Sequence, residues 1–375
     1  MHLLLAPTAY KGTLSPREAV FAMAEGIAAA MPQAVLDLCP MADGGTGWLD
    51  VWAFHRKEQA ERYPIPTVDA LGRPLMAEWL LVKPHTAIVE SAQACGIHHL
   101  MAHELAPMDA TSVGVGHLLR AVAAHPQVRE IWLGLGGTAS TDGGIGALQA
   151  LGYQILDTRG QPVPPNGNGL AQVAHIHPPS PNPLQGKTLI VCADVENPMT
   201  GPEGSARVYA PQKGADAHQV SVLETGLARW AKLLEQTFDI EVATLHGSGA
   251  AGGMAGGLSA CLNAPIVSGI GWLMHHIGWS ERLAKADYLF TGEGQADAQT
   301  LMGKGVGVVV QSAVALGKPV FLIAGRTGAG IEALHHLPAM TVATLLTEAS
   351  GTSTPTTALR SLCETIARRL APSQS

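Results

Sequence analysis

Short apolar runs, each followed by a polar loop and then by a helical pattern, recur along this chain of 375 residues. Leu3 to Ala6 is one such run, and Ser15-Pro16-Arg17-Glu18 after it forms a capping box with proline at the first helical position. The apolar spacing predicts a helix from there to Pro32. Tyr288 to Phe290 and Val320 to Ala324 repeat the strand pattern near the other end. This alternation predicts parallel sheets with helices on both faces.

The middle of the chain differs from its ends. Ile131 to Leu133 and Leu189 to Ala193 are predicted strands, but the loops between them are longer, including the Pro/Asn/Gly-rich stretch 161–183. A chain of this length usually forms more than one core. We therefore predict an α/β fold of two domains. Residues 1–66 and 285–375 form a Rossmann-like parallel-sheet domain from both chain ends, and residues 67–284 form an inserted α/β domain.

Charge and cysteine content narrow the classes of partner. The chain has 23 Lys and Arg against 30 Asp and Glu, a net charge of −7, with no basic cluster. This argues against nucleic acid and against a membrane surface, and favours a small-molecule substrate. Five separate cysteines without a Cys-x-x-Cys motif predict reduced core thiols, and the lack of a signal sequence predicts a cytoplasmic protein. The sequence is also compatible with a homodimer.

Glycine is abundant, at 43 residues, and it is clustered. Gly134 to Ala139 follows a predicted strand and resembles a dinucleotide-binding turn, with Asp157 as the acidic partner. This motif keeps an NAD-binding dehydrogenase as an alternative, although Asp142-Gly143-Gly144 stands where the helix should open. A Walker A loop before Lys187 would require glycine at the position of Pro181. Any nucleotide would therefore need a different phosphate-binding loop.

Several further loops pair glycine with lysine or a carboxylate at predicted strand ends. Glycine lets successive backbone N–H groups converge on a phosphate, lysine neutralises phosphate oxygens, and carboxylates hold Mg²⁺ or accept a proton. One Asp-Gly pair alone is more often a simple turn. Several at strand ends favour a ligand site, because ligands of open α/β sheets collect there. Together they indicate a kinase.

The ordered motifs resemble those of bacterial glycerate kinases of the glyoxylate and galactarate routes, over residues 3 to about 325. They are the segments Ala6 to Leu14, Pro40 to Gly45, Gly136 to Gly144, Asp194 to Pro202, Ala210 to Ala215, Gly249 to Gly253 and Thr291 to Thr300. The resemblance implies ATP-dependent phosphorylation of D-glycerate on its 2-hydroxyl. It also implies a two-domain α/β enzyme with an interdomain cleft.

Four positions depart from the family pattern. Thr8 and Thr46 stand where the family usually has acids, Thr141 where it has Asn, and Gln295 where it has Arg. Because lost charge at an anion site changes which substrate fits, a kinase for a related sugar acid is a second hypothesis. A non-catalytic sensor of sugar acids is a third, but phosphate-facing lysines together with acids argue against it.

Roles in the kinase hypothesis follow from charge neutralisation and positioning, which supply most of the acceleration in phosphoryl transfer. The predicted catalytic residues are Lys11, Asp194, Lys213 and Asp297, with Asp194 and Asp297 also binding Mg²⁺. The predicted substrate-binding residues are Asp43, Gly44, Gly45 and Asn197. The predicted phosphate- or nucleotide-binding residues for ATP are Gly136, Gly137, Thr138, Gly252, Gly253 and Glu293. Asp43 could instead cap the helix that follows it.

Overall fold

The computed structural model describes residues 1–10, 12–193, 195–301, 305–337, 339–345 and 354–371. The chain divides into two compact units: unit 1 contains residues 1–42 and 270–375, and unit 2 contains residues 43–269. The divisions predicted after residues 66 and 284 fall instead inside strand β3 (Ala60–Val68) and helix α11 (Trp279–Lys285). Both are regular hydrogen-bonded elements, so neither position is a linker.

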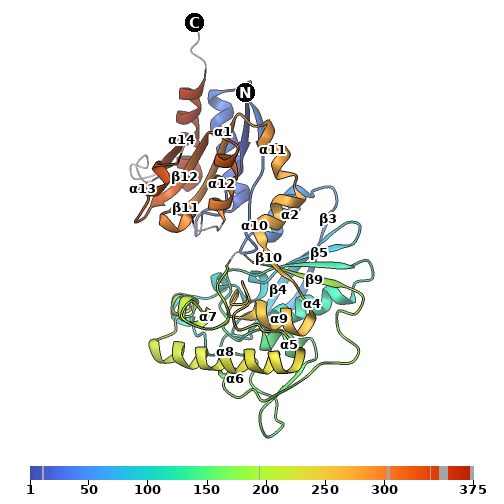
Figure 1. The fold of residues 1–375 in the computed structure, drawn as a ribbon. Helices are drawn as coiled ribbons and strands as arrows, with labels where there is room; N and C mark the ends of the chain where they lie inside the picture. The colour runs from blue at the N-terminus through green and yellow to red at the C-terminus, as the bar shows by residue number, and fades with distance from the viewer. Residues whose placement is uncertain (11, 194, 302–304, 338, 346–353, 372–375) are drawn as a thin grey trace. The chain divides into compact units, whose positions relative to one another are not determined.

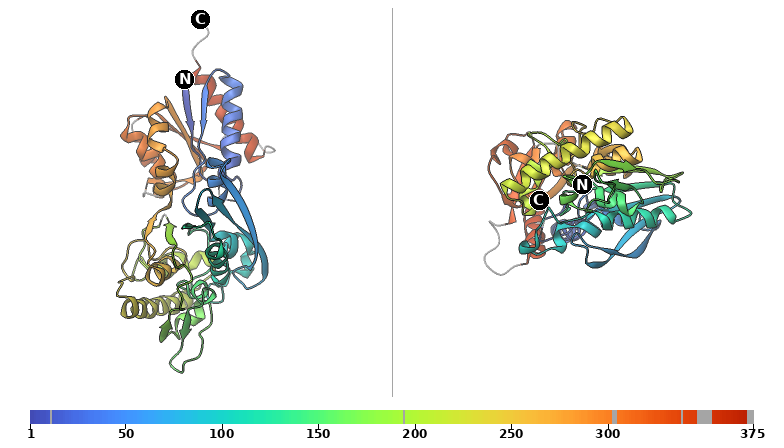
Figure 2. Two further views of the ribbon diagram at one scale, coloured as in Figure 1. Left: turned by 90° about the vertical axis from the view of Figure 1, so that its right-hand side faces the viewer. Right: turned by 90° about the horizontal axis from the view of Figure 1, so that it is seen from below.

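Unit 1 is built on a five-stranded sheet in which every neighbouring pair is parallel. Its strand order is β13 (Met340–Thr344), β12 (Val320–Thr327), β11 (Tyr288–Ala296), β1 (His2–Leu5) and β2 (Val35–Leu38). Helices α1 (Pro16–Ala30) and α14 (Pro355–Leu370) cover one face of this sheet, and α11 and α12 (Val306–Ala315) cover the other (Figure 1, Figure 2). The predicted doubly covered parallel sheet is confirmed.

The start of α1 forms as its sequence predicts. The Ser15 hydroxyl accepts a hydrogen bond from the Glu18 N–H, and the Glu18 carboxylate accepts one from the Ser15 N–H. The buried face of the helix, with Met23 and Ile27, packs with Leu359 of α14 against the sheet. The strand predicted over Tyr288 to Phe290 is longer in the structure, because β11 continues to Ala296, where it pairs with Thr327.

Unit 2 contains a six-stranded sheet that is only partly parallel, which the strand–helix alternation did not predict. The order is β10 (Ile266–Ser268), β9 (Thr188–Ala193), β6 (Glu130–Gly134), β5 (Thr86–Glu90), β4 (Pro74–Val82) and β3. Each neighbouring pair from β10 to β5 is parallel. Strand β4 pairs antiparallel with β5, and β3 pairs antiparallel with β4. A tight turn joins β3 to β4, in which the Asp69 carboxylate accepts the N–H groups of Leu71 and Arg73.

The two faces of this sheet bury different sets of side chains. Val89, Ile131 and Leu133 join the main core, which includes residues of the helices α3 (Ala92–Cys95), α4 (Val113–Ala124), α5 (Ile145–Ala150), α8 (Ala217–Phe238) and α9 (Met254–Leu262). Side chains alternate along a strand, so Trp132 faces the other way. There it meets Trp52 of α2 (Trp48–His55), with ring centroids 4.8 Å apart. Trp48 and Trp52 are both buried in the core.

The remaining elements are short. They are η1 (Ile97–His99), η2 (Ala102–Glu104), β7 (Gln154–Leu156), α6 (Gly167–Leu170), β8 (His175–His177), α7 (Ser205–Tyr209), η3 (Pro211–Lys213), α10 (Gly269–His276), η4 (Ala298–Leu301) and α13 (Glu332–His335). All five cysteines are free and buried, which confirms the predicted core thiols. Within the described ranges, no helix combines the length and the apolar character needed to cross a membrane.

Candidate active site

Two predicted loops of unit 2 stack on each other at the carboxyl edge of its sheet. A Cβ built on Gly44 would lie 2.4 Å from the carbonyl oxygen of Cys192, at the end of β9. One built on Gly136 would lie 2.6 Å from the Cα of Gly45. Only glycine permits this approach of backbone to backbone. The structure therefore brings the predicted substrate residues Asp43, Gly44 and Gly45 directly against the predicted phosphate-binding residues Gly136 and Gly137.

Asp43 is held within its own loop. Its Oδ1 accepts a hydrogen bond from the Gly45 N–H at 3.0 Å. Helix α2 begins after Gly47, and no hydrogen bond from Asp43 caps it. The alternative role of Asp43 as a helix cap is therefore not the one the structure shows.

The cap of α2 comes from a residue that the sequence analysis missed. Glu90, at the end of β5, is only 2% exposed, and it accepts the Gly47 N–H at 3.2 Å with Oε1 and the Leu49 N–H at 3.0 Å with Oε2. Burial raises the pKa of Glu90 to about 7, although these N–H groups oppose the shift. The one sequence signal was an acid that closes an apolar strand.

Gly252 and Gly253 adjoin the loop that follows Gly137. The Gly143 N–H donates to the Gly252 carbonyl at 3.0 Å, and a Cβ on Gly252 would lie 2.3 Å from the Ser140 carbonyl oxygen. Gly253 precedes the first residue of α9, and the first N–H groups of this helix donate within the protein, with the Gly253 N–H bonded to the Gly249 carbonyl at 3.2 Å and the Gly256 N–H to the Ser248 carbonyl at 3.0 Å. Thr138 is buried and forms a β-bridge with Gly96.

Lys213 lies beneath the same loop. Its Nζ donates a 2.6 Å hydrogen bond to the Ser140 carbonyl, and the residue is only 4% exposed. Burial lowers the pKa of Lys213 to about 8, against the opposing effects of Cys95 and Asp142. Asp142 is itself buried and accepts hydrogen bonds from the N–H and hydroxyl of Ser112. Lys213 thus ties the glycine loop to η3.

Asn197 braces its own loop. Its Nδ2 donates to the Glu203 carbonyl at 2.9 Å, and its Oδ1 accepts from the Tyr209 hydroxyl at 2.6 Å. The Gly249 N–H donates to the main-chain carbonyl of Asn197, which joins this loop to the segment before α9. The predicted residues Lys11 and Asp194 lie outside the described residues.

The predicted residues of unit 1 gather at the carboxyl edge of the other sheet. Thr300 joins them, because its hydroxyl donates to Glu293 at 2.8 Å and accepts the Asp297 N–H at 3.0 Å. Gln295 Nε2 donates to Asp297 Oδ2 at 2.6 Å, and Arg326 Nε donates to Gln295 Oε1 at 2.8 Å. Gln295, one of the departures from the family pattern, therefore links a cation to Asp297.

The residues proposed for a dinucleotide do not form such a site. Asp157 directly follows β7, in a short hairpin turn where its Oδ1 accepts the N–H groups of Arg159 and Gln161. After the glycine string, no helix starts before Ile145. These carboxylate bonds hold a hairpin turn, and the NAD alternative loses its acidic partner.

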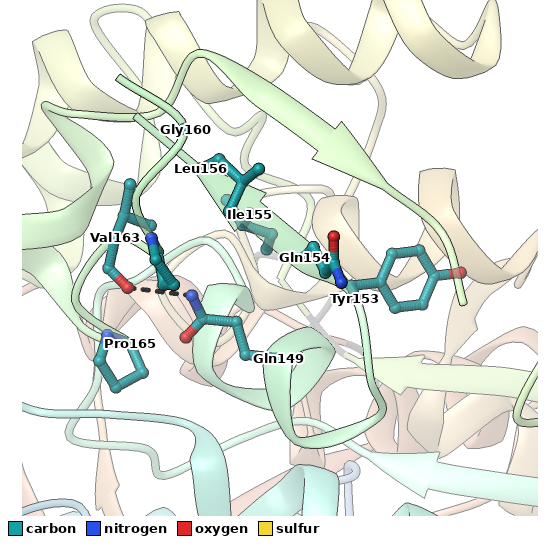
Figure 3. Close-up of a pocket in the computed structure, with 9 residues that line it drawn as sticks. Gln149, Tyr153, Gln154, Ile155, Leu156, Gly160, Val163 and Pro165 are labelled. Carbon is teal, nitrogen blue, oxygen red and sulfur yellow. Dashed lines mark hydrogen bonds between the residues drawn. The ribbon is translucent and has the colours of Figure 1, made fainter. Parts of the chain in front are cut away.

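A surface hollow near β7 is separate from the predicted loops. It has a volume of about 580 Å³, and its lining contains none of the predicted site residues. Figure 3 shows Gln149 at its edge, with Nε2 donating to the Val163 carbonyl at 3.0 Å. The candidate site is therefore defined by the stacked loops and not by this hollow.

Known proteins match this chain along nearly all its length. The profile of the glycerate kinase family matches residues 3–373. A glycerate kinase of Halalkalibacterium halodurans is 36% identical over 336 residues, covering 89% of this chain and 88% of that protein. The glycerate 2-kinase of Escherichia coli K12 is 32% identical over 338 residues, covering 90% and 88%. A crystal structure from Salmonella typhimurium LT2, of a protein provisionally named glycerate kinase 2, superposes with a TM-score of 0.79 at 30% identity, covering 99% and 98%.

Proposed function

This chain belongs to the glycerate kinase family, and from that premise we propose that it transfers the γ-phosphoryl group of ATP to the 2-hydroxyl of D-glycerate. The observation that carries the proposal is the stacking of the loops 43–47 and 134–138 at the carboxyl edge of a sheet. Ligands of open α/β sheets bind at this edge. The relative named glycerate 2-kinase supports the position of transfer.

In unit 2 we propose that one set of residues binds the acceptor and another set binds phosphate. Asp43, Gly44, Gly45 and Asn197 bind glycerate, and the backbone N–H groups of Gly136, Gly137, Thr138 and Gly252 bind phosphate oxygens. Gly253, whose N–H donates to the Gly249 carbonyl, shapes the end of the phosphate-binding loop. Among the described residues, Ser140 is the one hydrogen-bond partner of the Lys213 ammonium. Its two other N–H donors support a role in neutralising the phosphoryl group or the glycerate carboxylate.

In unit 1 we propose the acid–base chemistry together with part of the nucleotide site. Asp297, or Asp194 of unit 2, accepts the proton of the 2-hydroxyl while that oxygen bonds to the γ-phosphorus. The bond between the γ-phosphorus and the bridging oxygen breaks, and ADP leaves with both electrons of that bond. Glu293 helps to hold the nucleotide, and Lys11 neutralises charge on the transferred group.

Magnesium suits this donor set. Among the described residues no group of three or more His, Cys, Asp or Glu side chains gathers as a cation site. Mg²⁺ in phosphoryl transfer usually takes only one or two carboxylates and fills its other positions with water and phosphate oxygens. Asp297 and Asp194 are the carboxylates we propose for it. The ion would neutralise the charge of the ATP phosphates.

A coupled assay of ADP release tests the proposal. We expect turnover with D-glycerate, Mg²⁺ and ATP, and only background ADP release without an acceptor or with L-glycerate. Adding enolase identifies the product, because it dehydrates 2-phosphoglycerate directly and leaves 3-phosphoglycerate unchanged. ADP release that does not depend on D-glycerate, or a product that enolase leaves unchanged, would contradict the proposal.

A kinase for a related sugar acid is the second candidate. The Thr8 hydroxyl donates to the Gly292 carbonyl at 3.0 Å, and the Gln295 amide is bonded to Arg326 and Asp297. Uncharged side chains engaged within the protein recognise an acceptor differently from free charges. A panel of hydroxy acids under the same conditions decides, since the true acceptor has the highest kcat/KM.

A further inference from the structure

Strand β5 ends in a carboxylate, Glu90, at the carboxyl edge of the sheet where the predicted site lies. Side chains alternate along a strand, so Ile88 and Glu90 share one face while Val89 points into the main core. Ile88 pairs with Leu80 and Trp132 in the neighbouring strands, and Trp132 contacts Trp52 of α2. Glu90 is therefore buried on the α2 side of the sheet, at the last position of its strand.

The geometry of Glu90 fits the start of α2. The N-cap residue Gly47 has no side chain to offer, and the Asp43 carboxylate is bonded to the Gly45 N–H. The two oxygens of Glu90 instead bind the N–H groups of Gly47 and Leu49. A helix N-terminus stabilises negative charge, which explains how a carboxylate is accommodated here.

Hydrogen bonds and the short backbone between them connect Glu90 to Asp43. Beyond the bonds to Glu90, the Trp48 N–H donates to the Gly45 carbonyl at 3.1 Å, and the Gly45 N–H donates to Asp43 Oδ1. Fixing the start of α2 therefore fixes the turn that aims Asp43. No atom of Glu90 needs to touch a ligand for this effect.

We propose that Glu90 is a positioning residue, which holds the Asp43–Gly47 loop in the geometry that binds the phosphoryl acceptor. The assignment of glycerate as that acceptor rests on the proposed function, whereas the mechanical link between Glu90 and the loop does not. Glu90 does this because each of its two oxygens accepts a hydrogen bond from a different N–H group of the loop and helix.

The charged surroundings of Glu90 are simple. Leu80, Ile88 and Trp132, which share its face of the sheet, carry no charge. Asp50, in the first turn of α2, is the charged group that acts on Glu90, and Asp50 is itself paired with Arg62 at 2.5 Å.

Glu90→Gln tests the proposal, with Glu130→Gln as the control. Gln keeps the size of the side chain but turns an NH₂ group toward one of the two N–H donors. We expect KM for D-glycerate to rise about tenfold or more, the scale for a lost hydrogen bond to a charged group, with kcat and KM for ATP within about twofold. Glu130 begins β6, at the opposite end of the sheet, and its variant should behave as wild type.

The split between KM and kcat separates positioning from a structural role. A merely structural loss lowers the amount of active enzyme, and therefore kcat, and leaves KM for D-glycerate unchanged. A loss of kcat with unchanged KM would overturn the proposal.

Hydrogen exchange tests the link between Glu90 and the Asp43–Gly47 loop without an assay of turnover. We expect faster exchange over residues 43–52 in Glu90→Gln than in wild type. If Glu90→Gln does not fold, Glu90→Asp gives the same measurement, because the shorter side chain keeps the charge but does not reach both N–H groups. Absent glycerate turnover with this exchange behaviour would reject the proposed function alone. Exchange that neither substitution changes would reject the role of Glu90.

Discussion

Gly269 lies against the backbone of Asp43, since a Cβ built at residue 269 would come within 2.3 Å of the Asp43 carbonyl oxygen. The same Cβ would lie 3.1 Å from the Gly44 N. Asp43 and Gly269 are the first and last residues of unit 2, so its two chain ends meet at the predicted acceptor loop. The position of this loop is therefore sensitive to the smallest side chain at residue 269.

Gly269→Ala should raise KM for D-glycerate about tenfold and lower the melting temperature. The added methyl must displace the Asp43 backbone, and overpacking of this kind costs on the order of 1–3 kcal/mol. Gly160→Ala is the matched control. That residue has φ +74° and open space around its Cβ, so the variant should lose about 1 kcal/mol with no change in KM. Equal kinetics in both variants would show that the contact does not position Asp43.

Lys213→Met should lower kcat by about a hundredfold, because it removes a positive charge beside the glycine loop and the bond to the Ser140 carbonyl. The pH dependence of stability checks the buried amine. Its pKa of about 8 lies below that of an exposed lysine, so the folded state holds fewer protons than the unfolded state above pH 8. Wild type should gain stability from pH 8 toward pH 10, and Lys213→Met should lack that gain. Parallel melting curves would contradict the burial.

Glu90 changes the stability with pH in the direction opposite to that of Lys213. Its pKa of about 7 lies above the ordinary glutamate value, so the folded state holds the extra proton between those values. Wild type should therefore lose stability as the pH rises from about 4.5 to about 7, by an amount on the order of 3 kcal/mol, relative to Glu90→Gln. Urea unfolding at pH 5 and pH 8 measures this difference. A wild type that gains on the variant with rising pH would show that the carboxylate is not buried as described.

Much of the fold was predictable because its signals are local. The capping box at Ser15 and the apolar run at Leu3 depend on neighbours in sequence, and both were predicted correctly. The antiparallel strands β3 and β4 were not predicted, since pairing depends on residues far apart in space. The apolar run at Tyr288 to Phe290 likewise predicts only the start of β11, because its polar continuation to Ala296 is held by pairing with β12.

The residues of the candidate site also separate into those that the sequence predicts and those that it does not. The glycine strings were visible because close backbone approach demands glycine, and Gly45 and Gly136 meet in this way. Glu90 was missed because its partners are N–H groups of another element, which become neighbours only when α2 packs on the sheet. The buried bond between Lys213 and Ser140 likewise depends on η3 lying beneath a distant loop.

Asp194→Asn and Asp297→Asn test which carboxylate takes the hydroxyl proton. The variant that removes the base should lose about a hundredfold to ten-thousandfold in kcat, because the amide cannot accept the proton in the transition state. For Asp297 the amide group would also face the Gln295 Nε2 donor, which now lies 2.6 Å from Oδ2. Gln295→Ala separates these effects, since it removes that contact and keeps the carboxylate.

Asp157→Asn is the control for both variants. This residue belongs to unit 2 but accepts hydrogen bonds in a hairpin turn, so its variant should keep wild-type turnover with a small loss of stability. Single-turnover kinetics with D-glycerate and ATP measure the chemical step directly. Rates near wild type in both Asp194→Asn and Asp297→Asn, with melting temperatures unchanged, would show that neither carboxylate is the base. The proton would then have to leave to water or to a phosphate oxygen, which the loose transition state of phosphoryl transfer permits.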